Sequence, residues 1–379
     1  MTGKSYFHRG GDTPLLGETI PEHFARIVKQ FPDNEAIVSI PQNRRLSYRE
    51  LAEETDRVAK GLLAFGFGKG DRLGVWSTNN IEWLLLQLAT ARIGVVLVNI
   101  NPAYRPRELA YALQRSEVEC VVTIPSFRTS DYVAMLAELV PELTSSKPGD
   151  FKNDELPFLE HVILYDPADP DKTQRPHPGF DTWPELLAAG ERVKQESLEL
   201  ASAELDIDDP INIQYTSGTT GFPKAVVLTH HNILNNGWFT ARAMHFTDKD
   251  RLCIPVPFYH CFGMVMGNLG CTSHGATMVI PGDAFDPGAV LEAVQDFAQT
   301  LRPDFPSHFG QLLGRRGAHH PAREREHRRP GREPLAGRRR GDPGGHHHRA
   351  PARRRPDGGR GGPDLDRRRR HDPGRSPER

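Results

Sequence analysis

The first third of the chain alternates between helix-type and strand-type patterns, and this alternation limits the fold more than any other feature. The capping box Ser47-Tyr48-Arg49-Glu50 predicts a helix to about residue 65, whose Leu51, Val58 and Leu62 share one face. The elements predicted next are a strand over 72–77, a helix over 80–93, a strand over 95–100, a helix over 107–116 and a strand over 120–124. Strands separated by helices indicate a mostly parallel sheet covered on both faces, so the predicted fold class is α/β.

The middle of the chain is less regular. Residues 141–209 contain one clear predicted strand, 161–165, among Pro-, Asp- and Lys-rich connections that we interpret as a surface excursion. The elements predicted beyond it are strands over 211–215, 225–228, 251–256 and 276–280, and helices over 231–244, 262–273 and 287–297.

The loop between the predicted strands 211–215 and 225–228 has the composition of a phosphate-binding loop. Two glycines permit φ > 0 and close approach of a ligand, and backbone amides and hydroxyls can point at a polyphosphate. A lysine adds a mobile positive charge for the terminal oxygens. The candidate ATP-binding residues are Thr216, Ser217, Gly218, Thr219, Thr220, Gly221 and Lys224.

Two other interpretations of this loop exist. A generic Ser/Thr/Gly surface turn has the same composition. The Walker A loop ends in Gly-Lys-Ser/Thr, and that ending is absent because Lys224 follows Pro223 and precedes Ala225.

The whole string from residue 215 to residue 224 resembles the phosphate-binding signature of the adenylate-forming superfamily, which includes acyl-CoA synthetases. Other segments resemble landmarks of that family in the family order, over roughly residues 5–295, and most resemble medium- and long-chain fatty acyl-CoA ligases. These segments are Lys69-Gly70-Asp71-Arg72-Leu73-Gly74-Val75-Trp76, Asn80-Ile81-Glu82-Trp83, Val98-Asn99-Ile100-Asn101-Pro102-Ala103-Tyr104-Arg105, Leu228-Thr229-His230-His231-Asn232 and Pro257-Phe258-Tyr259-His260-Cys261-Phe262-Gly263.

The resemblance implies the parallel-sheet subdomains of an adenylation N-terminal domain. It also implies AMP-forming ligation of a fatty acid to coenzyme A, with ATP and Mg²⁺. A carboxylate oxygen attacks the α-phosphorus of ATP, pyrophosphate leaves, and the thiol of coenzyme A then displaces AMP. Lys224 and His260 are the catalytic candidates: Lys224 counters charge on pyrophosphate, and His260 lies near the substrate carboxylate.

Two of these site assignments have a structural alternative. His260 can instead be a histidine satisfied at a strand end. Trp238, Phe239 and Met264 are either lining residues of an acyl tunnel or part of the packed core.

The composition of the chain changes near residue 300. From Arg302 onward there are 22 Arg, no Lys and 10 Asp or Glu, and residues 310–379 lack Phe, Tyr, Trp, Val, Ile and Met. Such a segment cannot bury enough apolar surface to offset its conformational entropy, so we expect disorder. It is a basic nucleic-acid-binding tail, a solvated linker or the product of a shifted reading frame. We favour the shifted frame, because Arg, Gly, Pro and Ala have GC-rich codons.

We therefore expect two parts: residues 1–300, a partial AMP-binding domain, and residues 301–379, an Arg/Gly/Pro-rich tail. Family parts that we cannot recognise include the Tyr-Gly-x-Thr-Glu segment for adenine and magnesium, the ribose-binding aspartate and the C-terminal domain with its lysine. We expect this truncated chain to be inactive alone. The alternative function is a non-catalytic nucleotide-binding remnant whose basic tail contacts nucleic acid.

Other functional classes have little support. No Cys-x-x-Cys pair occurs, and we interpret Cys261 and Cys271 as buried residues and not as metal ligands with His274. Cysteines without a disulfide framework and a polar start without a secretory signal favour the cytoplasm. The apolar stretch 83–88 is too short to span a bilayer, so we expect peripheral membrane contact at most. No nucleic-acid partner is expected for the enzyme, and nothing indicates an oligomeric state.

Overall fold

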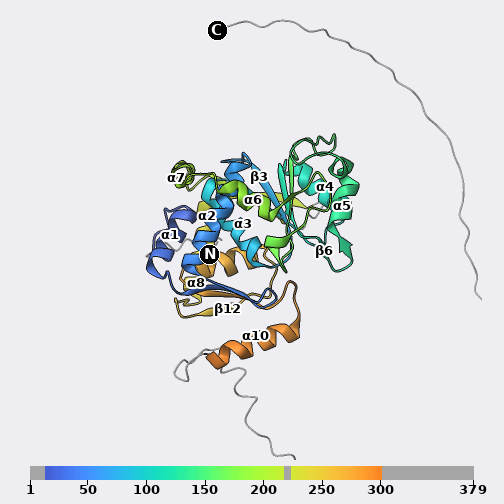
Figure 1. The fold of residues 1–379 in the computed structure, drawn as a ribbon. Coiled ribbons are helices and arrows are strands. Elements are labelled where there is room, and N and C mark those ends of the chain that lie inside the picture. Colours follow the sequence, from blue (N-terminus) through green and yellow to red (C-terminus); the bar gives the residue numbers. More distant parts are fainter. Residues whose placement is uncertain (1–12, 217–222, 301–379) are drawn as a thin grey trace, which may run out of the picture. The chain divides into compact units, whose positions relative to one another are not determined.

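The computed structural model describes residues 13–216 and 223–300, except for the side chains of 297–300 (Figure 1). The chain divides into two units, Met1–Arg316 and Gly317–Arg379, and every described residue belongs to the first. Residues 217–222 of the predicted phosphate loop and the predicted tail 301–379 lie outside the described residues.

A seven-stranded sheet forms the larger β-structure of this unit. Its strand order is β11-β10-β4-β3-β5-β8-β9. Every neighbouring pair is parallel except β10 and β11, which are antiparallel. The strands are β3 (Arg72–Trp76), β4 (Val96–Ile100), β5 (Cys120–Thr123), β8 (His161–Leu164), β9 (Asp181–Thr182), β10 (Pro210–Thr216) and β11 (Lys224–Thr229). The predicted α/β class with a mostly parallel sheet is confirmed.

A second sheet joins the beginning of the chain to residues beyond 250. Its order is β12-β13-β1-β2, with β1 parallel to β13 and antiparallel to β2. The strands are β1 (Glu35–Ser39), β2 (Arg44–Ser47), β12 (Arg251–Cys253) and β13 (Thr277–Ile280). The short strands β6 (Ser126–Phe127) and β7 (Ser130–Asp131) form a separate hairpin.

Two helices lie between these sheets. Helix α2 (Tyr48–Ala64) contacts β1 and β2, and α3 (Ile81–Ile93) contacts β3 and β4, while the helices pack on each other (Figure 1). Nearly all side chains of α3 are buried, as expected for a helix that lacks a solvent-exposed polar face. Asn80 caps its first turn by accepting from the Trp83 N–H at 2.8 Å. Gly94 ends it at φ 77, a conformation that glycine adopts without steric cost.

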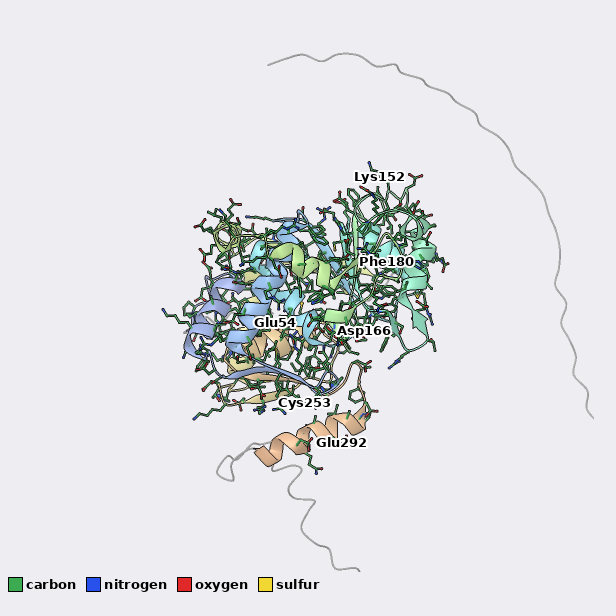
Figure 2. All side chains as sticks on the ribbon, in the orientation of Figure 1. Glu54, Lys152, Asp166, Phe180, Cys253 and Glu292 are labelled. Carbon is green, nitrogen blue, oxygen red and sulfur yellow. The ribbon has the colours of Figure 1, made fainter. Side chains whose placement is uncertain are left out.

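A buried carboxylate fixes the β1–β2 hairpin to α3. Glu82 is fully buried and accepts hydrogen bonds from Gln42 at 2.7 Å and Arg44 at 3.0 Å. Burial raises the pKa of Glu82. Arg44 also pairs at 2.6 Å with Glu54 of α2, which is labelled in Figure 2.

The remaining helices lie around the two sheets. They are α1 (Ile20–Gln30), α4 (Pro106–Arg115), α5 (Tyr132–Leu139), α6 (Trp183–Gly190), α7 (Gln195–Ala203), α8 (His230–Ala243), α9 (Gly270–Thr272) and α10 (Pro287–Thr300), with 3₁₀ turns η1 (Pro141–Thr144) and η2 (Pro170–Lys172). Helix α10, marked by Glu292 in Figure 2, contacts β12, marked by Cys253. Across the described ranges, no helix combines the length and apolarity needed to cross a membrane.

Two sequence interpretations need correction. Residues 141–209 are more than a surface excursion, because they contain β9, α6 and α7, and α6 packs on α2. The predicted helix over 262–273 is mostly a π-helix, η3 (Phe262–Leu269), followed by the short α9.

Candidate nucleotide and carboxylate site

The β10–β11 hairpin holds the two ends of the predicted phosphate loop side by side. Thr216 and Lys224 are directly paired across this antiparallel ladder, and both side chains are exposed. Gln214 and Tyr215 precede the loop on β10, and Pro223 follows it. The loop residues Ser217, Gly218, Thr219, Thr220 and Gly221 lie outside the described residues.

Both ends of this loop are anchored to helix α4. The Tyr111 hydroxyl of α4 donates to the Pro223 carbonyl at 3.1 Å. The Tyr215 hydroxyl donates to the Ala112 carbonyl at 2.9 Å and accepts from Ser116 at 2.6 Å. Burial raises the pKa of Tyr215 to about 12, so this hydroxyl keeps its proton at neutral pH. The loop thus starts and ends at fixed points.

His260 lies in a tight turn between β12 and η3. Its own N–H donates to the Pro257 carbonyl at 3.2 Å, and its carbonyl accepts from the N–H groups of Gly263 and Met264, each at 3.0 Å. A side chain at Gly263 would collide with the Pro257 backbone, so the turn needs glycine there.

The hydrogen bond of the His260 ring determines its neutral tautomer. The Phe262 N–H donates to Nδ1 at 3.1 Å, which makes Nδ1 an acceptor and places the proton on Nε2. The side chain is exposed, and the part of the chain that the structure describes provides no hydrogen-bond partner for Nε2. Neutral His260 can therefore donate one hydrogen bond to an anionic ligand.

The side chains around this turn differ from expectation in part. Cys261 is exposed, with its Sγ 3.7 Å from His260 Nδ1, so the prediction of a buried residue is wrong there, whereas Cys271 is buried as predicted. Met264 is fully buried. Trp238 and Phe239 are half-buried on α8, and their rings pack edge to face with centroids 4.8 Å apart.

Polar side chains connect the turn to the strand that enters the phosphate loop. Asn212 of β10 donates to Asn99 of β4 at 2.8 Å, and Asn99 donates to the Tyr259 carbonyl at 3.0 Å. Gln214 of β10 and Asn99 both approach the Met264 sulfur, at 3.7 and 3.4 Å. The structure therefore places the segment before His260 beside β4 and β10.

Sequence reasoning missed the part that asparagines play here. Asn99 stood out only as part of the family-like segment 98–105, and Asn79 was not considered. One signal was present: Asn79 follows the predicted strand 72–77, and Asn99 lies near the carboxyl end of the predicted strand 95–100. Ligands bind at this edge of open α/β sheets.

The π-helix depends on a distant glutamine. Gln87 of α3 donates to the Met264 carbonyl at 3.4 Å and accepts from Asn268 at 3.0 Å. Departures from α-helical bonding of this π type are frequent at functional sites.

Two further features bear on ligands. An open depression of about 480 Å³ contains no candidate site residue; its lining residues are Pro125, Ser126, Arg128, Thr129, Ser130, Asp131, Val133 and Pro176. Among residues 13–216 and 223–300, no cluster of three His, Cys, Asp or Glu side chains could hold a metal ion.

Comparison with known sequences gives a family match and related proteins. The AMP-binding enzyme family matches residues 24–344. The medium-chain acyl-CoA ligase ACSF2, mitochondrial, of Danio rerio is 37% identical over 312 residues, which cover 82% of this chain and 50% of that protein. The putative acyl-CoA synthetase YngI of Bacillus subtilis is 39% identical over 307 residues, covering 81% of this chain and 54% of that protein. The chain thus spans about half the length of these curated relatives.

Solved structures share the fold. ATP-bound MatB from Rhodopseudomonas palustris superposes with a TM-score of 0.55 at 26% identity, over 72% of this chain and 47% of that one. A long-chain-fatty-acid-CoA ligase (FadD1) from Archaeoglobus fulgidus gives a TM-score of 0.60 at 21% identity, over 78% and 53% of the two chains.

Proposed function

The chain belongs to the AMP-binding enzyme family, and on that premise we propose that it carries the phosphate- and carboxylate-binding half of an AMP-forming fatty acyl-CoA ligase. The observation that carries the proposal is the hairpin of β10 and β11, which presents Thr216 and Lys224 at the two ends of a loop with phosphate-binding composition. The similarity, over four-fifths of the chain, to proteins named acyl-CoA ligase and putative acyl-CoA synthetase supports the reaction class.

In this proposal the loop binds the triphosphate. Ser217, Gly218, Thr219, Thr220 and Gly221, together with Thr216, offer hydroxyls and backbone N–H groups to the β- and γ-phosphates. Lys224 neutralises charge that accumulates on pyrophosphate as it leaves. Its position opposite Thr216 supports this role, since the lysine stands where the loop closes.

His260 is proposed to orient the fatty acid. A carboxylate is ionised at neutral pH, so no base is needed to activate it. The Nε2–H of His260 donates to one carboxylate oxygen and leaves the other free to attack the α-phosphorus. The new P–O bond forms as the bond to pyrophosphate breaks. The sulfur of coenzyme A then attacks the acyl carbon and AMP leaves.

Magnesium is proposed to enter with ATP. Mg²⁺ is usually held by one or two carboxylates together with phosphates of the substrate. The described part of the chain offers no three-residue cluster of metal-ligating side chains, so we assign the ion no residue there. Bound to ATP, it would offset phosphate charge.

The proposed substrate is a medium-chain fatty acid. Several relatives, each matched by this chain over half of the relative's length, are named medium-chain acyl-CoA ligases. We expect the adenine and ribose contacts, and the steps that use coenzyme A, to need residues outside those described. The family segments expected to supply them are not recognisable in this sequence, so we expect the 379-residue chain to form no detectable thioester.

The test measures pyrophosphate release and acyl-CoA formation with acids from hexanoate to stearate. It compares this chain with a version translated in the alternative frame after about residue 300. In the frame-restored protein, Lys224→Ala should slow adenylation by roughly 10- to 1000-fold. Lys249→Ala, another exposed lysine, should not slow it. A frame-restored protein that binds ATP but releases no pyrophosphate would instead favour a nucleotide-binding remnant.

A further inference from the structure

The backbone that leads into the His260 turn is held by a buried side chain from the connection between β3 and α3. Asn79 is only 5% exposed. Its Oδ1 accepts from the Phe258 N–H at 2.7 Å, and its Nδ2 donates to the Val256 carbonyl at 2.9 Å. The side-chain amide of Asn79 thus pairs with both a backbone N–H and a backbone carbonyl of an irregular segment, as a neighbouring strand would.

A second asparagine holds the next peptides from the end of β4. Asn99 is 1% exposed, and its Nδ2 lies 3.0 Å from the Tyr259 carbonyl and 3.4 Å from the Phe258 carbonyl. Its Oδ1 accepts from Asn212 of β10 at 2.8 Å. Asn99 therefore joins the residue before His260 to the strand that enters the phosphate loop.

These contacts end one residue before His260, whose ring is bonded only within its own turn among the described residues. The position of that ring consequently depends on how the peptides from Val256 to Tyr259 are held. Strand β3, which ends three residues before Asn79, and strand β4, which carries Asn99, are direct neighbours in the seven-stranded sheet. A rigid parallel sheet is a suitable support, because a small displacement of a catalytic group costs much rate.

We propose that Asn79 and Asn99 are positioning residues, which fix His260 relative to the strand that carries the phosphate loop. The inference deepens the proposed function and rests on it for the role of His260. In this arrangement one sheet positions both the carboxylate bound by His260 and the α-phosphorus of ATP. Asn99 connects the two, because it contacts both Tyr259, the residue before His260, and Asn212 of β10.

The experiment compares Asn79→Leu and Asn99→Leu in the full chain with Asn235→Leu. Asn235 is a matched control. It is 7% exposed and, like Asn79, accepts from a backbone N–H and donates to a backbone carbonyl, here both of Leu16, at 2.7 and 3.1 Å. Amide hydrogen exchange reports on residues 256–264. The ¹⁵N shifts of the His260 imidazole, assigned with His260→Gln, report its tautomer.

Both site variants should speed exchange in 256–264 by about 10- to 100-fold, because each removes buried hydrogen bonds. They should also replace the Nε2–H signature of His260 with an average of both tautomers, and Asn235→Leu should change neither signal. Unchanged exchange and an unchanged tautomer in Asn99→Leu and Asn79→Leu would overturn the inference.

A milder variant guards against unfolding. Asn99→Asp keeps the volume and the acceptor for Asn212 but loses the donor to Tyr259, so it should give the same two changes. In the frame-restored protein, both Leu variants should lower kcat for adenylation about tenfold or more with little change in the KM for ATP. Hydrogen exchange and the ¹⁵N shifts can both be measured without turnover. If the proposed function is wrong, the frame-restored protein releases no pyrophosphate. If the positioning role is wrong, amide exchange in the Asn variants is unaltered.

Discussion

Glu119 shows how a single residue couples this fold to pH. It directly precedes β5, its carboxylate lies 2.8 Å from the Arg72 guanidinium, and its side chain is 19% exposed. Burial, followed by the neighbouring Asp71, raises the pKa of Glu119 to about 7. In the folded chain this carboxyl keeps its proton up to about pH 7, while in the unfolded chain it ionises near its ordinary value of 4.5. Its contribution to stability is therefore complete below pH 4.5 and lost as the pH rises to 7.

The prediction at this residue is that Glu119→Gln raises the free energy of unfolding at pH 8 by about 1 kcal/mol, with solvent screening allowed for, and leaves it unchanged near pH 4. Glu117→Gln is the matched control, because Glu117 pairs with the same Arg72 at 3.4 Å but is 57% exposed. Urea denaturation at both pH values measures the difference. A Glu119→Gln effect of equal size at pH 4 and pH 8 would contradict the assigned cause.

At the scale of elements, the crossing of α2 and α6 depends on two glycines. A Cβ at Gly61 would lie 2.5 Å from the Leu186 carbonyl oxygen, and one at Gly190 would lie 2.6 Å from the Gly61 nitrogen. Because these neighbours are backbone atoms, a methyl group there must push the helices apart.

We expect Gly61→Ala to lower the free energy of unfolding by about 1–3 kcal/mol. Gly68→Ala is the control, since a Cβ there meets no atom within 4 Å. Thermal denaturation of both variants is the measurement. Equal melting temperatures would show that α6 does not pack on α2 as described.

The sequence predicted the elements whose signals are local. The capping box at Ser47 predicted α2, and the alternation of helix-type and strand-type segments predicted α3 and the parallel sheet. Helix α6 was missed although Thr182 and Glu185 form a capping box, because the surrounding Pro and Asp residues suggested loops. The π-helix could not be predicted, since its bonding partner Gln87 is 177 residues away from Met264. The asparagine contacts to 256–259 are equally remote, with separations of 160 and 179 residues.

At the scale of the whole chain, the region that matches the family extends into the segment whose composition changes. The family match extends to residue 344, past the point near residue 300 where the composition becomes rich in Arg, Gly and Pro. A shifted reading frame predicts that the gene's nucleotide sequence, read in another frame after about codon 300, encodes Tyr-Gly-x-Thr-Glu and a later lysine-bearing domain. If neither other frame encodes them, the shifted-frame hypothesis is wrong.

The central claim is that this chain binds nucleotides through the phosphate loop. Titration calorimetry with ATP, GTP and tripolyphosphate tests it directly, using the 379-residue chain, Lys224→Ala and Lys249→Ala. The three ligands should bind within about threefold of one another, and Lys224→Ala should weaken each about tenfold, the loss of one charge contact. Lys249→Ala should bind like the unaltered chain. Strong preference for ATP over tripolyphosphate, or unchanged binding in Lys224→Ala, would contradict the claim.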